Sequence, residues 1–336
     1  MTFLLKSLQV GSLQLKNRLV MPPMATSKAD ADGKVNQANL DYYAEKTKGG
    51  YLALVIIEHS FISLQGKASQ FQLSVAEDEV VPNLKKLAEV IHQNGSKCVM
   101  QINHAGSAAT KEVTGTIGVG PSAVLHPRSG SDIPHELERA EIEQIVLDFQ
   151  KAAKRVKEAG FDGVEIHAAH GYLLNQFYSP LCNRRTDEFG GTVQNRIRFH
   201  LMVIAAVRQV VGEDFLILLR LGAADYKGGG ATIEDSLIAA REFEKAGVDL
   251  LDISGGLCGY QIPGGTNEQG FFAPLSEAIK QVVTIPILLT GGITEADAAE
   301  QLLAAGKADF IGVGRAILRD SDWAKRAFQG DGGIGT

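Results

Sequence analysis

Short apolar runs alternate with longer amphipathic stretches along most of the chain. The apolar runs predict eight β-strands, at residues 18–24, 52–59, 97–103, 163–167, 215–221, 250–254, 287–290 and 310–313. The stretches that follow them predict eight helices, at residues 37–48, 79–93, 139–159, 193–211, 233–246, 275–282, 295–305 and 322–328. Most of the strand runs are almost continuously apolar, which is typical of parallel strands buried on both faces. The alternation therefore predicts an α/β protein with a (β/α)₈ TIM barrel.

Two segments fall outside this alternation. Residues 3–15 alternate around Val10-Gly11-Ser12 and predict a hairpin that closes the barrel floor. Residues 105–138 follow the third strand and are rich in Gly, Ser and Pro, and loops of that length are usually functional or mobile. Because barrel active sites lie at the carboxyl ends of the strands, we expect this segment to cap a substrate, with a passive excursion as the alternative. Residues 1–336 are thus expected to form a single domain.

The composition excludes several classes of partner. The 336 residues are 45% apolar and carry a net charge of −6. Lys and Arg are scattered, so we expect no nucleic-acid partner, and no apolar run approaches the roughly 18 residues of a membrane span. The chain opens without the positive segment of a signal peptide. Cys98, Cys182 and Cys258 form no C-x-x-C pair, so we expect no disulfide, zinc or iron–sulfur cluster and a cytoplasmic location.

Side chains that can carry chemistry gather directly after the fourth predicted strand. His167, His170 and Tyr172 follow one another closely there. Two imidazoles can donate hydrogen bonds to an oxygen that gains negative charge, and a nearby phenol can deliver a proton. Reduction of an activated double bond needs both. The same histidines with a carboxylate such as Glu165 also fit a metal site, and ordinary structural histidines are the third interpretation.

The flanking residues extend this motif. It reads HAAHGYLLNQFYSP at residues 167–180 and continues as NRRTDEFGG at residues 183–191. A metal site does not require these flanks. The segment resembles the active-site strand of the Old Yellow Enzyme family, the flavin-dependent ene reductases. The resemblance implies bound FMN, NADH or NADPH as a transient reductant, and a small-molecule acceptor with an activated C=C bond, such as an α,β-unsaturated carbonyl compound. It also implies that His167 and His170 hold the acceptor oxygen, that His167 also contacts the flavin, and that Tyr172 protonates the acceptor.

The first predicted strand ends in a second part of the resemblance. Residues 21–26 read MPPMAT and resemble the family's Pro-Pro-Leu-Thr or Pro-Met-Cys corner, which implies that Pro23, Met24 and Ala25 line the flavin. The family usually has Thr or Cys at the position of Ala25, and that side chain bonds the flavin O4. Because alanine has no donor, we expect either that Thr26 takes this role or that the flavin lacks the bond.

Three further strand ends contribute polar side chains. His59 ends the second strand, where the family has a small residue; it reaches the flavin's pyrimidine edge or the substrate, or it is a buried structural histidine. The amide of Gln101 has both donor and acceptor, which suits the pyrimidine ring. Arg220 ends the fifth strand, and an unpaired buried charge is expensive. The resemblance places Arg220 beside flavin N1 and the C2 oxygen, with a structural ion pair to Glu165 as the alternative.

The last two strands end in glycines. Gly291 and Gly292 follow strand seven, and Gly314 and Arg315 follow strand eight. Glycines at these two places form the common phosphate site of such barrels, and Arg315 adds a fork of donors, so we expect the FMN phosphate here. No G-x-G-x-x-G follows a strand and opens a helix, so we expect the nicotinamide nucleotide to visit the flavin and leave.

Two other functions stay open. One is a metal-dependent barrel lyase or hydrolase that uses His167, His170 and Glu165. The other is a non-catalytic flavin-binding protein, which Ala25 suggests. Neither a membrane nor a nucleic acid is expected as a partner, and the sequence leaves homo-oligomer formation open.

Overall fold

A closed barrel of parallel strands forms the centre of the protein. The structure is a computed structural model that describes residues 2–128 and 132–329. Within these residues, eight strands pair in chain order and the last closes onto the first. They are β3 (Leu19–Met21), β4 (Leu54–Phe61), β5 (Lys97–Asn103), β8 (Gly163–Ala168), β9 (Leu216–Gly222), β10 (Leu250–Ser254), β11 (Ile287–Leu289) and β12 (Phe310–Gly312). The predicted (β/α)₈ TIM barrel is confirmed.

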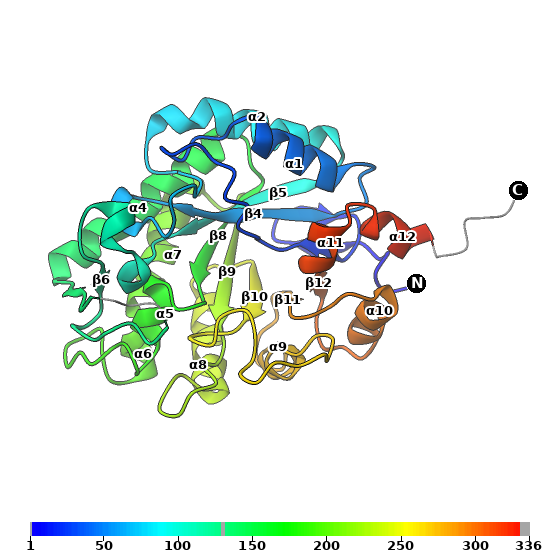
Figure 1. Ribbon diagram of the computed structural model, residues 1–336. Helices are drawn as coiled ribbons and strands as arrows, with labels where there is room; N and C mark the ends of the chain where they lie inside the picture. The colour runs from blue at the N-terminus through cyan, green and yellow to red at the C-terminus, as the bar shows by residue number, and fades with distance from the viewer. Residues whose placement is uncertain (1, 129–131, 330–336) are drawn as a thin grey trace, which may run out of the picture.

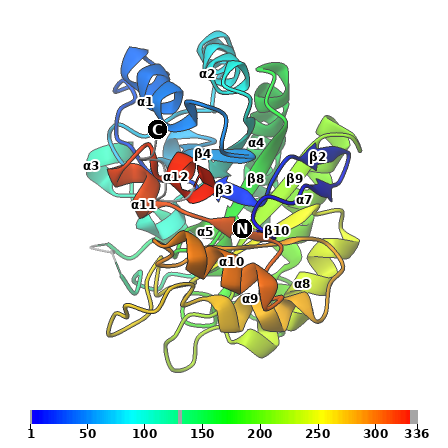
Figure 2. The same cartoon turned by 90° about the vertical axis from the view of Figure 1, so that its right-hand side faces the viewer.

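Helices surround the barrel, with α1 and α2 on one side and α8 and α9 on the opposite side (Figures 1 and 2). Helix α4 shows why these segments are helical: Ile142, Ile145, Phe149 and Val156 recur every three to seven residues and are buried, while most of the exposed positions carry charged or polar residues. The main helices are α1 (Gln37–Thr47), α2 (Val81–Gln93), α4 (Arg139–Glu158), α7 (Arg198–Val211), α8 (Ile233–Lys245), α9 (Ala273–Lys280), α10 (Ala296–Ala304) and α12 (Trp323–Gln329). No helix in the described parts is both long and apolar enough to cross a membrane.

The structure corrects several helix predictions. The helix predicted over residues 193–211 is two helices, α6 (Val193–Arg196) and α7, which meet at Ile197, where ψ is −4° and not the value of about −42° of a regular α-helix. The prediction also missed three short helices, α3 (Lys111–Thr114), α5 (Leu173–Tyr178) and α11 (Arg315–Arg319). One or two turns are too short to repeat the helical hydrophobic period, so no pattern marked them.

The predicted hairpin closes the barrel floor. Strands β1 (Leu8–Val10) and β2 (Leu13–Leu15) pair antiparallel. Val10 and Leu15 belong to an apolar cluster inside the barrel that includes Leu54, Leu216 and Phe310. Burial of these side chains seals the end of the barrel opposite the carboxyl ends of the strands.

Strand β9 shows how the barrel interior changes from apolar to polar. Leu216 and Leu218 belong to the interior cluster, whereas Ile217 and Leu219 belong to the larger cluster outside it. Since side chains alternate along a strand, the next interior position is Arg220. The floor of the barrel is therefore apolar, and charged and polar side chains begin near the carboxyl ends.

The predicted cap is folded onto the motif that follows β8. It contains α3 and a short parallel pair, β6 (Val119–Gly120) with β7 (His135–Glu136). Nη1 of Arg185 donates to the carbonyl oxygens of Pro121 at 2.9 Å and Leu137 at 2.7 Å. Nε2 of Gln176 donates to the carbonyl oxygen of Ala105 at 2.9 Å. Residues of the motif, Gln176 and Arg185, thus hold the predicted cap in place. Residues 129–131 of the predicted cap lie outside the described residues.

Candidate active site

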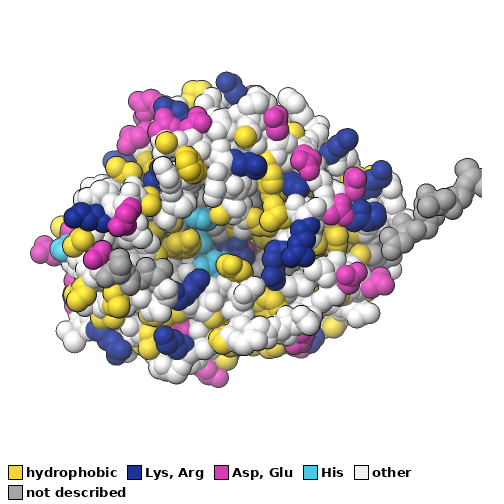
Figure 3. All heavy atoms as spheres, viewed as in Figure 1, with side chains coloured by type: hydrophobic (Ala, Val, Ile, Leu, Met, Phe, Trp, Pro, Cys, Tyr) yellow, Lys and Arg dark blue, Asp and Glu magenta, His cyan; other side chains and the backbone are white. Residues whose placement is uncertain are grey.

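A cavity of about 480 Å³ opens at the carboxyl ends of the barrel strands, a volume within the range of ligand pockets. Histidine side chains lie in the hollow on this face, and Lys and Arg side chains border it (Figure 3). All the predicted site residues line this cavity, namely Pro23, Met24, Ala25, His59, Gln101, His167, His170, Tyr172, Arg220, Gly291, Gly292, Gly314 and Arg315. The structure therefore brings together side chains from seven separate parts of the chain.

His167, His170 and Tyr172 form one cluster of rings. The His167 ring centroid lies 5.1 Å from that of His170 and 5.1 Å from that of Tyr172. Nε2 of His170 is 2.8 Å from Oγ of Ser254. Burial lowers the pKa of His167 and of His170 well below the usual histidine value, so both rings are neutral near pH 7. A neutral imidazole still has one N–H donor, which leaves each ring able to bind an oxygen.

His59 joins this cluster from a break in the β4–β5 ladder. The strand register shifts between Ile57 and Ser60, and such bulges re-aim side chains. The His59 ring centroid lies 5.4 Å from that of Tyr172. The amide oxygen of Gln72 accepts from Ala68 N–H at 2.7 Å, and its Nε2 lies 2.6 Å from Nδ1 of His59. Nδ1 therefore accepts, and the proton of this neutral ring is on Nε2. Burial lowers the pKa of His59 to about 4.

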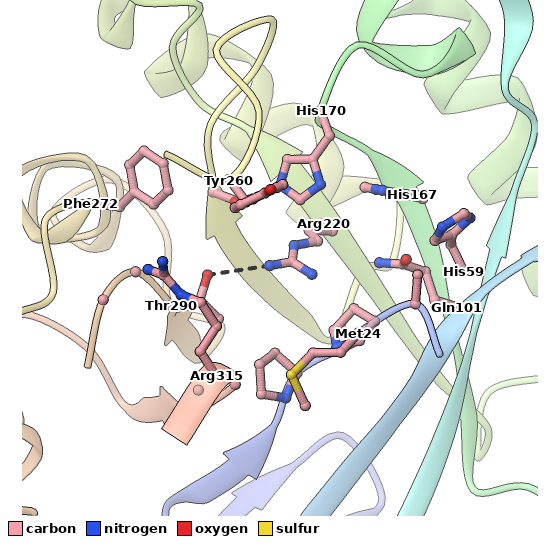
Figure 4. Close-up of a pocket in the computed structure, with 18 of the residues that line it drawn as sticks. Met24, His59, Gln101, His167, His170, Arg220, Tyr260, Phe272, Thr290 and Arg315 are labelled. Atoms are coloured by element: carbon pink, nitrogen blue, oxygen red, sulfur yellow. Dashed lines mark hydrogen bonds between the residues drawn. The ribbon is translucent and has the colours of Figure 1, made fainter. Parts of the chain in front are cut away.

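Arg220 lies at the centre of the cavity, between the histidine end and the end formed by Thr290 and Arg315 (Figure 4). Its Nη2 donates to Oγ1 of Thr290 at 3.4 Å. The ion-pair partner of Arg220 is Asp252, with Nε 3.2 Å from Oδ2, and not Glu165, the partner named in the alternative interpretation of Arg220 as a structural ion pair. Strand register explains the correction: Asp252 lies directly opposite Arg220, whereas Glu165 lies opposite Leu218, one layer lower.

Glu165 instead contacts Gln101, whose Nε2 donates to Oε2 of Glu165 at 2.6 Å. Both side chains are buried. Burial, reinforced by the charge of Asp252, raises the pKa of Glu165 well above its usual range. A neutral carboxylic acid therefore lies beneath the site, and the amide oxygen of Gln101 is left for a ligand.

The other end of the cavity is shaped by glycine backbone. Gly291 and Gly292 have φ values of +127° and +70°, which L side chains rarely adopt. A Cβ at Gly314 would fall 3.2 Å from Sδ of Met24. Arg315 begins α11 directly beyond and lines the same end. Backbone N–H groups and a guanidinium close together suit a phosphate group.

Thr26, which follows β3, is held by the carboxylate of Glu58. Its hydroxyl donates to Oε1 of Glu58 at 2.5 Å, and its N–H donates to Oε2 of Glu58 at 2.8 Å. Ala25 lines the cavity, whereas Thr26 is not among the lining residues. The hydroxyl of Thr26 is therefore engaged on the protein side of the chain, and the geometry gives no support to Thr26 as the replacement for the missing Thr or Cys.

Several lining residues were missed by sequence reasoning. Ser254 and Thr290 are the last residues of two strands that were predicted, so their position at the carboxyl ends was a usable signal. Phe272, Tyr260 and Arg128 come from a helix cap and two loops, where no periodic pattern says which side chain turns inward.

The geometry gives no metal centre among the predicted histidines. Within the described residues, the group of side chains close enough to share a metal ion is His92, Cys98 and Asp162. It lies at the opposite, amino-terminal end of β5. The Asp162 carboxylate already accepts from Lys97 Nζ at 3.0 Å and from the N–H of Cys98 at 2.9 Å. All three cysteines of the chain are unpaired.

The cavity has the groups that FMN requires. Nδ1 of His167 is buried without a hydrogen-bond partner among the described residues, and an unsatisfied buried polar atom normally has a ligand or water as its partner. The left-handed pair Gly291–Gly292 and Arg315 form the phosphate end. The guanidinium groups of Arg220 and Arg315 at the cavity suit an anionic ligand.

Comparisons with known proteins agree with this arrangement. The model of the NADH:flavin oxidoreductase / NADH oxidase family matches residues 4–331. An NADH oxidase of Thermoanaerobacter brockii is 42% identical over 96% of this chain, and the chain spans 50% of that protein's length. An NADPH dehydrogenase of Clostridium acetobutylicum is 37% identical over 93% of this chain and 90% of its own. The structure of an old yellow enzyme homologue from Zymomonas mobilis superposes with a TM-score of 0.85 at 28% identity, over 97% of this chain and 92% of the other.

The chain spans about half the length of the NADH oxidase and nearly the whole length of the NADPH dehydrogenase. FMN is the cofactor of this family, and NADH or NADPH is its reductant. The family match, the barrel and the cavity at its carboxyl end lead to one conclusion: this chain belongs to the NADH:flavin oxidoreductase / NADH oxidase family, which includes the old yellow enzymes.

Proposed function

We propose that this protein is an FMN-dependent NAD(P)H oxidoreductase that reduces activated C=C bonds of α,β-unsaturated carbonyl compounds. The observation that carries the proposal is the cluster of His167, His170 and Tyr172, in which the His167 ring centroid lies 5.1 Å from each of the other two, at the cavity that Arg220 also lines. Two neutral donors and one phenol around a single space match the two needs of this reduction, an oxygen to be held and a carbon to be protonated.

The residues of the cavity divide into two groups. Pro23, Met24, Ala25, His59, Gln101, His167 and Arg220 would hold the isoalloxazine, and Gly291, Gly292, Gly314 and Arg315 would hold the phosphate. When bound, FMN would supply the hydride, taken from NADH or NADPH, that reduces the acceptor at its β carbon. The guanidinium of Arg220 gives positive charge where the pyrimidine ring would lie, which favours an anionic form of that ring.

His167 and His170 would donate hydrogen bonds to the acceptor's carbonyl oxygen. Negative charge grows on that oxygen during reduction, and preorganised donors stabilise it without reorganisation. Burial lowers the pKa of both imidazoles, so these donors stay neutral and lose no proton to the oxygen. Nδ1 of His167 is buried without a partner among the described residues, which leaves it for a ligand.

Tyr172 would protonate the acceptor's α carbon. It is the N-cap residue of α5, directly after the turn that carries His170. Burial raises the pKa of the Tyr172 phenol, and Arg128 opposes this rise. The phenol is therefore protonated at neutral pH, which a general acid requires before it acts.

Several broader expectations accompany this proposal. The chain would act as a single FMN-binding domain, with residues 105–138 as a cap over a small-molecule acceptor. NADH or NADPH would bind transiently. A cytoplasmic location and a homo-oligomer stay predictions, and no membrane or nucleic-acid partner is expected.

The test combines the visible spectrum with turnover. We expect the purified protein to be yellow, to release FMN and not FAD on denaturation, and to oxidise NADPH or NADH anaerobically when 2-cyclohexenone is added, with cyclohexanone as product. A colourless protein with stoichiometric metal would instead support a metal-dependent lyase or hydrolase. Bound FMN that NAD(P)H reduces but no enone reoxidises would support a non-catalytic flavin-binding protein or a different acceptor.

A further inference from the structure

Arg128 brings a third cationic side chain to the cavity, from the cap. Nη1 of Arg128 donates to the carbonyl oxygen of His170 at 2.9 Å. Nε2 of His126 lies 2.8 Å from the carbonyl oxygen of Gly171. This second contact joins the same part of the cap to the turn that follows β8. The guanidinium of Arg128 is therefore held at the turn that carries His170 and Tyr172.

The loop after β10 lies against the guanidinium on the other side. A Cβ at Gly259 would fall 2.8 Å from Nη1 of Arg128, so the guanidinium lies close to the backbone of this loop. Tyr260 follows at once, and its ring centroid is 6.4 Å from that of His170. One side of the cavity mouth is thus bordered by Arg128, Tyr260 and His170. The guanidinium of Arg128 has five N–H donors, and its hydrogen bond to the carbonyl oxygen of His170 uses one of them.

The lining of the cavity is cationic although the chain as a whole is acidic. The net charge is −6, yet the described lining residues include Arg128, Arg220 and Arg315 and no carboxylate. The field of Arg128 reaches the reacting groups. Burial lowers the pKa of His170 and the charge of Arg128 adds to this effect, whereas burial raises the pKa of Tyr172 and the charge of Arg128 opposes it. A cleft lined by one sign of charge concentrates ligands of the opposite sign.

Two of these cations are accounted for by FMN and the third is not. Arg315 lies at the phosphate end and Arg220 on the cavity floor, whereas Arg128 lies at the mouth beside the proposed acceptor site. Resting on the function proposed above, we propose that Arg128 forms an anion subsite and that the preferred acceptors carry a carboxylate or phosphate in addition to the activated C=C bond. A guanidinium binds such groups through paired, charge-assisted hydrogen bonds.

The experiment compares matched acceptors in matched variants. The parent protein, Arg128→Gln, Arg128→Lys and Lys111→Gln are each assayed with 2-cyclohexenone and with its 3-carboxylate-bearing analogue. We expect the ratio of kcat/KM for the charged over the neutral acceptor to fall about tenfold or more in Arg128→Gln, which corresponds to one charged hydrogen bond. Arg128→Lys should keep part of the ratio. Lys111, an exposed cation of the same cap that does not line the cavity, should leave both values unchanged.

Equilibrium binding keeps this inference separate from the proposed function. Calorimetry with the saturated, unreactive cyclohexanone and its 3-carboxylate measures the subsite without turnover. Weaker carboxylate binding in Arg128→Gln would support the subsite whether or not any variant reduces an enone. If no variant reduces an enone, the ene-reductase proposal alone is overturned. An unchanged charged-to-neutral ratio and unchanged binding would overturn the subsite. So would an effect confined to the KM of NADPH, because Arg128 would then bind a phosphate of the reductant.

Discussion

Arg220 and Asp252 face each other across the β9–β10 ladder, with Nε of the guanidinium 3.2 Å from a carboxylate oxygen. Asp252 is fully buried and Arg220 is 6% exposed. The cation at the centre of the cavity therefore has its counter-ion in the barrel interior, below the cavity lining. Removal of one partner from a buried pair of this kind strongly destabilises the protein, because the other charge is then buried without a partner.

The first prediction follows from this pair. Arg220→Met and Asp252→Asn should each destabilise the protein by about 3–5 kcal/mol. They should shift the reduction potential of bound FMN in opposite directions, down for Arg220→Met and up for Asp252→Asn, because one removes positive charge and the other removes its counter-ion. Spectroelectrochemistry near pH 8 measures both potentials. Shifts in the same direction would show that the pair acts on the cofactor through packing and not through charge.

The second prediction concerns the neutral acid beneath Gln101. The pKa of Glu165 is held well above its usual range by burial and then by the charge of Asp252. A carboxyl with a raised pKa in the folded state contributes stability that is present at low pH and is lost as the pH rises through the folded pKa. Urea unfolding of the parent and of Glu165→Gln should therefore show the parent losing stability relative to the variant as the pH increases.

A surface variant controls this comparison. Glu268→Gln removes an exposed carboxylate that does not line the cavity. A stability difference between parent and Glu165→Gln that stays constant with pH, or that changes as much in Glu268→Gln, would mean that Glu165 is ionised in the folded protein.

The third prediction separates Ala25 from Thr26. Thr26→Val removes the hydroxyl that donates to buried Glu58, so we expect a loss of stability of about 1–3 kcal/mol and no change in the visible spectrum. Ala25→Thr adds a donor at a position that lines the cavity, so it should shift the flavin spectrum and potential. If Thr26→Val shifts the spectrum and Ala25→Thr does not, Thr26 supplies the flavin contact after all.

The sequence predicted the barrel well because its strands are apolar runs and its helices are amphipathic, and both patterns repeat. The site residues at strand ends, such as His167, Gln101 and Arg220, were predictable for the same reason: a strand that is located also locates its carboxyl end. Pairing was harder. Asp252 and Glu165 are both interior residues beside β9, and only the register of the ladders decides which one faces Arg220. Arg128 lies on a loop whose path depends on tertiary contacts with His170 and Gly259.

The fourth prediction uses the neutral histidines. Burial lowers the pKa of His59 to about 4 and those of His167 and His170 well below the usual value. We therefore expect kcat/KM for a neutral enone to show no histidine titration from about pH 5.5 to about pH 8. An inflection near the ordinary histidine pKa that disappears in His170→Asn would show that His170 is protonated in that range and donates as a cation.

The most direct test of the central claim is the anaerobic half-reaction with an enone. Protein reduced by NADPH is mixed with 2-cyclohexenone in a stopped-flow instrument, for the parent, Tyr172→Phe and Tyr178→Phe. Tyr178 is the matched control, since it is a buried tyrosine at the other end of α5 whose hydroxyl pairs with Ser236 outside the cavity. The account predicts reoxidation slowed by roughly 10²–10⁴ in Tyr172→Phe, unchanged in Tyr178→Phe, with the preceding reduction by NADPH preserved in both. Reoxidation by the enone as fast in Tyr172→Phe as in the parent, or absent from the parent itself, would contradict it.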